Sequence, residues 1–285
     1  MRIEYNFNLK YFNSYRLNSF CKRVYFPENE EDIVKLYKIK KDYIVLGGGY
    51  NIIFSKEYYE TDFIIFNGNF KNISVNKQDA IISAEAGATI FDVSKNALEN
   101  GLTGAEFFYD IPSSVGGAIV MNAGTKEGET QNILEKVRYL DLKDMIIKEK
   151  IKSELELEYR NSFFQKEKNK IILRAYFQLS RGNKKTIKNI MESSKKRRWE
   201  RQPRDLPNSG SVFKRPPGRF VGPMIDELGL KGYTIGGAQI SKKHSGFIVN
   251  INNAKGSDII KIISHVKEKV RQVFDLDLEV EQRII

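Results

Sequence analysis

The segment 42–55, DYIVLGGGYNIIFS, limits the possible fold more than any other part of the chain. Two apolar runs are separated by the three glycines of 47–49, which allow positive φ and let another group approach the backbone amides closely. A dinucleotide-binding fingerprint would need G-x-G-x-x-G leading into a helix, whereas the β-branched and aromatic residues at 52–54 favour a second strand. The turn is therefore either a tight hairpin or a phosphate-binding turn, and it is not a Rossmann motif.

A second glycine-rich turn, IPSSVGGAIVMNAG, occupies 111–124. Ser113 and Ser114 supply hydroxyls, the glycines that follow suggest exposed amides, and a helix beginning at Val115 would direct its positive end at an anion. Two such turns in one basic chain favour a ligand of the nucleotide type over purely structural turns.

The remaining pattern mixes segregated helices and strands. Helices are expected over 29–41 with Asn29 as N-cap, over 89–102 with Gly101 at the C′ position, over 184–201 and over 256–274. Strands are expected over 63–68, 80–87, 137–142, 153–160 and 170–180. Regular βα alternation is missing, so the pattern predicts an α+β fold, and the composition shift near 182–205 predicts the main domain boundary.

Composition narrows the class of protein. Of 285 residues only Cys21 is a cysteine, which excludes an internal disulfide and a cysteine-based zinc site. We find no apolar window long enough to span a bilayer and no secretory segment in residues 1–20, so we expect a cytoplasmic protein without membrane contact.

The formal net charge of +11 has two possible explanations. The densest basic run, 184–204, could bind nucleic acid, although no nucleic-acid-binding motif is present. Positive charge would also concentrate small anionic ligands such as nucleotides and diphosphates. Charge alone does not choose between them.

The segment 207–223, PNSGSVFKRPPGRFVGP, cannot form a regular helix or strand because prolines and glycines interrupt both. Val212 and Phe213 should hold it against a core, which a plain surface loop would not require. The loop presents Ser211 between Gly210 and Val212, followed by two cations.

Four elements in order carry a family resemblance: VLGGGYNIIFS, EFFYDIPSSVGGAIVMNAG, EYRNSFF, and PNSGSVFKRPPGRFVG followed by GLKGYTIGGAQISKKHSGFIVN. Together they closely resemble the UDP-N-acetylenolpyruvoylglucosamine reductases, over about residues 16–285. The last two elements are the most specific. The first two are shared with flavoproteins that bind FAD in the two-subdomain way of vanillyl-alcohol oxidase.

The resemblance implies a two-subdomain FAD-binding fold of the vanillyl-alcohol oxidase type plus a C-terminal α+β substrate-binding domain. We expect FAD-binding subdomains at 1–75 and 76–183 and a substrate-binding domain at 184–285. It further implies non-covalent FAD, NADPH as hydride donor, and reduction of UDP-N-acetylglucosamine enolpyruvate to UDP-N-acetylmuramate for peptidoglycan synthesis. We expect a monomer that binds neither nucleic acid nor membrane.

Three catalytic residues follow from the resemblance, and their chemistry is suitable. Ser211 is the serine of Gly-Ser-x-Phe that protonates C2 after hydride addition to C3. Arg160, in Tyr-Arg-x-Ser, offers a planar charged fork for the substrate carboxylate. Glu281, in the closing segment, would orient the enol-like intermediate or a water, or relay a proton.

The expected binding residues are taken from the same motifs. For FAD they are Gly47, Gly48, Gly49, Tyr50, Asn51, Ile111, Pro112, Ser113, Ser114, Gly116, Gly117, Asn122, Ala123 and Gly124. For the substrate they are Arg198, Arg201, Lys214 and Asn250, and no metal ligands are expected.

The chain resembles the compact form of the family, which lacks an inserted loop that carries a substrate-covering tyrosine. It departs from many relatives at Tyr109-Asp110 and at 125–128, which bears on the fine geometry of the flavin contacts. The alternatives are a different FAD enzyme of the same fold, such as an oxidase, and a basic nucleic-acid-binding protein.

Overall fold

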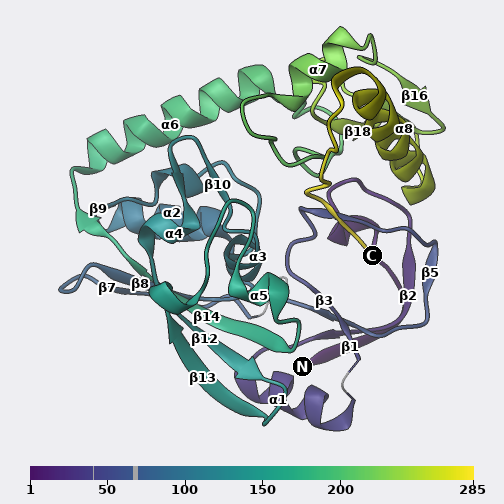
Figure 1. Cartoon of the computed structure of the whole chain (residues 1–285). Helices are drawn as coiled ribbons and strands as arrows, with labels where there is room; N and C mark the ends of the chain where they lie inside the picture. The colour runs from purple at the N-terminus through teal and green to yellow at the C-terminus, as the bar shows by residue number, and fades with distance from the viewer. Residues whose placement is uncertain (41, 67–69) are drawn as a thin grey trace. The chain divides into compact units, whose positions relative to one another are not determined.

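The computed structural model describes residues 1–40, 42–66 and 70–285 (Figure 1). The chain forms two compact units, each built from several stretches of sequence. Unit 1 comprises Met1–Glu4, Arg23–Gly48 and Thr61–Lys196, and unit 2 comprises Tyr5–Lys22, Gly49–Glu60 and Arg197–Ile285. Within the described ranges, none of the helices combines the length and the apolar composition that a bilayer span requires.

A five-stranded sheet is mainly parallel. Its strands are, in order, β1 (Arg2–Asn8), β2 (Phe20–Phe26), β6 (Phe63–Ile65) and β3 (Ile44–Leu46), and β5 (Tyr58–Tyr59) pairs with β2 off this path. Both β2 and β3 pair with β6 in parallel, and α1 (Glu30–Ile39) forms part of the crossover that parallel strands need. The Asn29 side chain accepts a hydrogen bond from the Asp32 amide at 2.9 Å, which confirms the expected N-cap.

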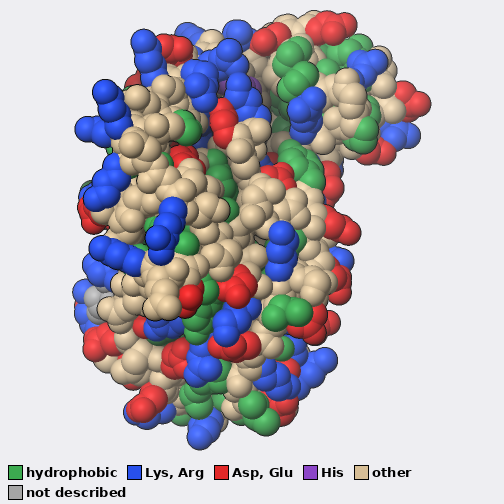
Figure 2. All heavy atoms as spheres, turned by 90° about the vertical axis from the view of Figure 1, so that its left-hand side faces the viewer, with side chains coloured by type: hydrophobic (Ala, Val, Ile, Leu, Met, Phe, Trp, Pro, Cys, Tyr) green, Lys and Arg blue, Asp and Glu red, His purple; other side chains and the backbone are tan. Residues whose placement is uncertain are grey.

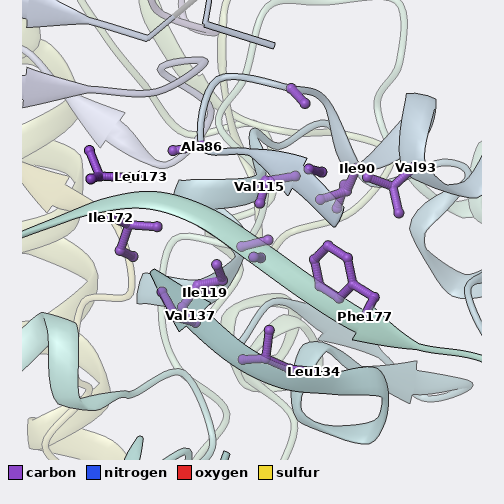
Figure 3. Close-up of a cluster of buried hydrophobic side chains, with 14 of the residues drawn as sticks. Ala86, Ile90, Val93, Val115, Ile119, Leu134, Val137, Ile172, Leu173 and Phe177 are labelled. Atoms are coloured by element: carbon purple, nitrogen blue, oxygen red, sulfur yellow. The ribbon is translucent and has the colours of Figure 1, made fainter. Parts of the chain in front are cut away.

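The second sheet of unit 1 is antiparallel and carries the main core. Its strands are, in order, β13 (Ile146–Ile151), β12 (Leu134–Asp141), β14 (Lys170–Gln178), β8 (Ile81–Glu85) and β7 (Ile73–Asn76). Two helices, α2 (Ile90–Glu99) and α3 (Val115–Val120), pack on it through buried apolar side chains. Figure 3 shows Ile90, Val115 and Ile119 from these helices among Val137 and Phe177 from the strands. This packing places the start of α3, and hence the second glycine turn, against the sheet.

Shorter elements complete unit 1. They are β9 (Leu102–Thr103), η2 (Glu106–Phe108), β10 (Gly124–Thr125), β11 (Gly128–Glu129), α4 (Thr130–Ile133), η3 (Lys152–Glu154), α5 (Phe163–Lys166) and β15 (Ser180–Arg181). The long helix α6 (Lys184–Arg201) continues from unit 1 into the residues assigned to unit 2.

Unit 2 contains a three-stranded antiparallel sheet and a long amphipathic helix. Its elements are η1 (Lys10–Phe12), β4 (Ile52–Ile53), β5 (Tyr58–Tyr59), α7 (Val221–Glu227), β16 (Thr234–Ile235), β17 (Ala238–Ile240), β18 (Ile248–Asn250), α8 (Gly256–Phe274) and β19 (Arg283–Ile284). Helix α8 buries Ile259, Ile263 and Val266 at helical spacing and contacts β16 and β17. The closing strand β19 pairs in parallel with β4, which joins the C-terminal segment to the residues after the first glycine turn.

Most of the predicted elements are confirmed, including the helices at 29–41, 89–102, 184–201 and 256–274, whose ends agree within three residues. Residue 41 of the first helix and residues 67–68 of the strand expected at 63–68 lie outside the described residues. The expected strand over 153–160 is wrong. Instead Glu156 and Arg160 have positive φ, 46° and 54°, which breaks extended backbone. The strands that flank β12 in the sheet are β13 and β14. The hairpin interpretation of 42–55 is also wrong, because β3 pairs with β6 whereas β4 pairs with β19.

Candidate active site

The two glycine turns meet in unit 1 at Gly47 and Ser114. A Cβ built on Gly47 would lie 2.1 Å from the Ser114 hydroxyl oxygen, so only glycine permits this approach. Ser114 is buried and caps α3, with its Oγ accepting from the Gly117 amide at 3.2 Å. The two turns, which are far apart in sequence, are therefore in direct contact in unit 1.

The first amides of α3 are already used inside the protein. The Val115 amide donates to Ala88 O at 2.8 Å and the Gly116 amide to Ala86 O at 2.9 Å. With the Gly117 amide bonded to Ser114, these three are not the exposed donors that the sequence suggested. Gly116 instead serves packing, since its Cβ would lie 3.3 Å from the Ala86 side chain.

The first turn is the better source of amide donors. Among the hydrogen bonds between described residues, none has the amide of Gly47, Gly48, Gly49 or Tyr50 as donor. In unit 2, Gly49 has φ +68° and packs so closely that a Cβ would lie 2.0 Å from Phe12 O. Free amides and the missing side chains of this turn fit the diphosphate of a dinucleotide such as FAD.

Asn122 and Arg160 are joined in unit 1 at the end of the second turn. The Arg160 guanidinium donates to Asn122 O at 3.3 Å and to Gly124 O at 3.0 Å. Asn122 is fully buried and donates from Nδ2 to Glu158 O at 3.0 Å. Arg160 is thus held beside the turn expected to bind flavin, with its charge carried on a half-buried side chain.

The remaining predicted residues of the second turn also lie in unit 1. Ile111 and Ser113 are half-buried and Pro112 is exposed. The Ala123 amide donates to Ala118 O at 2.8 Å, so this residue closes α3.

Ser211 lies in unit 2, on a loop that is anchored by buried residues. Ser211 is exposed, whereas Val212 and Phe213 are buried, as the sequence predicted. The Val212 amide donates to Gly246 O at 3.0 Å, and Val212 O accepts from the Glu281 amide at 2.9 Å. The loop therefore lies between residues 246–247 and the closing segment, and the structure brings Ser211 and Glu281 together within unit 2.

Asn51 connects the first turn to the same segment. Its Nδ2 donates to Glu281 O at 3.1 Å within unit 2. The backbone of Glu281 is thus held on both sides, by Val212 and by Asn51, and its half-buried side chain projects from a fixed position.

The four predicted substrate residues lie in unit 2 and differ in how far their side chains are engaged. Lys214 forms an ion pair with Glu279 at 2.6 Å. The Asn250 side chain donates to Tyr15 O at 2.8 Å and accepts from the Ala254 amide at 2.9 Å, so it is a buried connector. Arg198 is half-buried and donates to Gln202 Oε1 at 3.5 Å, and Arg201 is exposed at the end of α6.

His244 takes a structural place in unit 2. Burial lowers its pKa, and its Nδ1 accepts from the amide of Gly246 at 3.1 Å, the same residue whose carbonyl accepts from the Val212 amide. No group of three or more potential metal ligands occurs among the residues that the structure describes.

Sequence reasoning missed two polar residues that support the site. Ser162 is fully buried and donates to Val120 O at 2.8 Å, which fixes the turn that carries Arg160. Gln282 is buried and bonds to the Ser211 loop. The sequence contains a signal for Gln282. This residue takes the next inward position after the alternating apolar residues of the closing segment, and a buried amide there needs hydrogen-bond partners.

Basic side chains are abundant on the surface where α6 begins, as Figure 2 shows for its upper half. Exposed members on α6 are Lys184, Lys185, Lys188, Lys196, Arg197 and Arg201. The apolar side of the helix is limited to Ile187 and Met191, both buried. Exposed positive charge is therefore present on the outward face of this helix as well as on the rest of the surface.

Two parts of the chain match known protein domains. Residues 21–148 match an FAD-binding domain, and residues 202–285 match the C-terminal domain of UDP-N-acetylenolpyruvoylglucosamine reductase. The fold is therefore that of an FAD-binding protein with an additional C-terminal α+β domain.

Similar full-length proteins identify the family. The UDP-N-acetylenolpyruvoylglucosamine reductase of Francisella tularensis is 40% identical over 98% of both chains. That of Clostridium perfringens is 40% identical over 91% of this chain and 85% of its own. The crystal structure of the reductase from Thermus caldophilus superposes with a TM-score of 0.85 at 30% identity, covering 100% of this chain and 99% of the other. The chain belongs to the UDP-N-acetylenolpyruvoylglucosamine reductase family.

Proposed function

We propose that this chain reduces UDP-N-acetylglucosamine enolpyruvate to UDP-N-acetylmuramate, with FAD as cofactor and NADPH as reductant. The observation that carries the proposal is 40% identity over 98% of both chains with a reductase of this name. It accounts for both glycine turns and for the exposed loop that carries Ser211. An oxidase of the same fold would share the glycine turns but would not need this loop, and a nucleic-acid-binding protein would need neither.

FAD, when bound, passes a hydride from NADPH to C3 of the enolpyruvyl ether. The carbon–carbon double bond is saturated when C2 receives a proton, so the reaction consumes one NADPH and one proton. Gly47–Asn51 and the predicted residues of 111–124 would hold the cofactor, with the amides of the first turn on its diphosphate.

Arg160 binds the substrate carboxylate in this proposal. Asn122 O and Gly124 O accept hydrogen bonds from its guanidinium and orient it, and a planar guanidinium matches the geometry of a carboxylate. The negative charge that develops next to C2 is stabilised by this permanent cation.

Ser211 delivers the proton to C2. A hydroxyl is a weak acid in water, but beside a strongly basic carbanion it donates readily when its alkoxide is stabilised. Glu281, whose backbone is bonded to Val212, would orient the enol-like intermediate or a water, or relay a proton.

Arg198, Arg201 and Lys214 are proposed as the cations that meet the UDP-sugar. Lys214 can do so only by leaving or sharing Glu279. For Asn250 the observed contacts favour an indirect contribution, through the Tyr15 backbone and the turn at Ala254.

The division into 1–75, 76–183 and 184–285 stays our proposal for how flavin and substrate binding are distributed. We also propose that the enzyme acts as a monomer in the cytoplasm, without nucleic-acid or membrane partners. Light scattering on the purified protein would show a mass near 66 kDa instead of 32.9 kDa if the monomer assignment is wrong.

The test is an NADPH oxidation assay on the purified protein, with and without UDP-N-acetylglucosamine enolpyruvate. We expect a yellow protein that releases all its flavin on denaturation and oxidises NADPH only slowly until the sugar is added. A colourless protein that does not take up FAD would end the proposal. Rapid oxidation by dioxygen without the sugar would favour an oxidase.

A further inference from the structure

The side-chain amide of Gln282 lies within hydrogen-bonding distance of three consecutive backbone carbonyls, those of residues 209–211, in the loop that carries Ser211. Its Nε2 lies 3.1 Å from Ser209 O, 3.2 Å from Gly210 O and 3.4 Å from Ser211 O. An extended strand directs successive carbonyls to opposite sides, so this convergence needs a break in the backbone. Gly210, with φ +78°, supplies that break.

Tyr15 holds the other end of the same amide. The Tyr15 hydroxyl donates to Gln282 Oε1 at 2.9 Å, and both side chains are buried. Burial raises the pKa of Tyr15, so its hydroxyl stays protonated and remains a donor at all working pH values. The amide of Gln282 is thereby fixed with its NH2 toward the loop.

We infer that Gln282 is a positioning residue for Ser211, with Tyr15 as its anchor. The inference rests on the proposed function, in which Ser211 donates the proton. Gln282 does not reach the reacting atoms; it acts by fixing the carbonyl of Ser211 and the two preceding carbonyls, while the Val212 amide is fixed by Gly246 O. The Ser211 side chain is then attached to a backbone held in one position, which limits where its hydroxyl can lie.

Energetics favour a role in placement over one in stability alone. Hydrogen bonds of this kind contribute only modestly to stability once the lost bonds to water are counted. In contrast, a catalytic group displaced by about 1 Å can lose on the order of 100-fold in rate. Loosening the loop should therefore affect proton delivery far more than folding.

The decisive experiment compares Gln282→Leu with the wild type in each half-reaction by stopped flow. Leucine keeps the volume and removes the donor and acceptor. We expect flavin reduction by NADPH within about twofold of wild type, and reoxidation by the UDP-sugar slowed about 10- to 100-fold. Gln272→Leu, on the exposed part of α8, is the matched control and should leave both rates unchanged.

A double variant separates placement from stability. Gln282→Leu alone leaves the Tyr15 hydroxyl without its partner. Tyr15→Phe with Gln282→Leu also removes that hydroxyl and should recover the part of the lost Tm that its burial costs, while the three loop carbonyls still lack the amide donor. Reoxidation should stay slow in the double variant. Recovery of the rate together with Tm would overturn the inference, as would equal slowing of both half-reactions in Gln282→Leu.

Hydrogen exchange makes the inference independent of the assigned reaction. The peptide covering 208–213 should exchange faster in Gln282→Leu, with the rest of unit 2 unchanged. If the wild type does not turn over the UDP-sugar, the proposed function fails. If it does, and this peptide keeps its wild-type protection, the positioning inference fails.

Discussion

At the scale of single residues, the groups expected to do chemistry and the groups that hold them are different side chains. The Ser211 side chain is exposed. The side chains of Val212, Phe213 and Gln282, which hold its loop, are buried. Arg160 is similarly half-buried, while the neighbouring Ser162 is fully buried. Sequence motifs identify the first kind of residue, and contacts identify the second.

Removing the proton donor should separate the two half-reactions. In Ser211→Ala, NADPH should still bleach the flavin at close to the wild-type rate, because this step needs no proton at C2. Reoxidation by the UDP-sugar should fall by about 10²- to 10⁴-fold, the usual contribution of a positioned acid. Stopped-flow absorbance measures both rates. A loss of equal size in both would mean that Ser211 supports flavin binding, and normal reoxidation would remove it from the mechanism.

Gly47→Ala tests whether the contact between the two glycine turns is needed for flavin binding. The new Cβ would lie 2.1 Å from Ser114 Oγ, so one turn must move, and FAD affinity should fall at least tenfold. Fluorescence titration of the apoprotein measures it. Adding Ser114→Ala removes the clashing oxygen and should restore part of the affinity. If the double variant binds FAD no better than Gly47→Ala, the clash is not the cause.

At the scale of elements, the antiparallel sheet of unit 1 is joined by an ion-paired cluster as well as by its core. Asp141 on β12 accepts from Lys170 on β14 at 2.6 Å and from Lys148 on β13 at 2.9 Å. Burial alone would raise the pKa of Asp141, but these hydrogen bonds hold it well below its usual range. The carboxylate thus connects three neighbouring strands.

The pH dependence of stability should report on this cluster. A carboxyl with a lowered folded pKa stabilises the protein fully above the unfolded value, near 3.8, and loses this contribution as pH falls through the lower folded pKa. Asp141→Asn should therefore cost about 2 kcal/mol at pH 7, most of that at pH 3, and progressively less at still lower pH. Urea unfolding in a series from about pH 7 to about pH 2 measures this. Asp205→Asn, at an exposed position outside this cluster, is the control, and an equal cost of Asp141→Asn at every pH would show that charge is not the cause.

For the whole molecule, the net charge of +11 is the property that bears most directly on ligand binding. Clefts and surfaces of one sign raise the local concentration of oppositely charged ligands, and salt screens this effect. Both NADPH and the UDP-sugar are anions, so the charge suits the proposed reaction. The exposed basic face of α6 supplies part of it.

Arg201→Ala should raise the KM for the UDP-sugar about two- to fivefold at low salt, with FAD content unchanged, since Arg201 is exposed and offers charge rather than packing. The difference should shrink at high ionic strength. Lys184→Ala, at the other end of α6, is the matched control. If Lys184→Ala raises the KM equally, general charge is responsible and Arg201 makes no specific contact.

The helices, most of the expected strands and the glycine and serine motifs could be predicted from the amino-acid sequence alone. This was possible because caps such as Asn29 and apolar spacing such as that of 256–274 act within a few residues. The sequence pattern misplaced the strand at 153–160, where the positive φ of Glu156 and Arg160 depends on neighbours.

Only the tertiary structure decided which polar groups are already used. The Val115 and Gly116 amides are occupied by Ala88 and Ala86, so the second turn offers fewer donors than its glycines suggest. Gln282 is more than 260 residues from Tyr15 in the chain and still shares a hydrogen bond with it. Such partners are set by packing between distant segments, because a buried polar group must be satisfied by whatever the fold brings beside it.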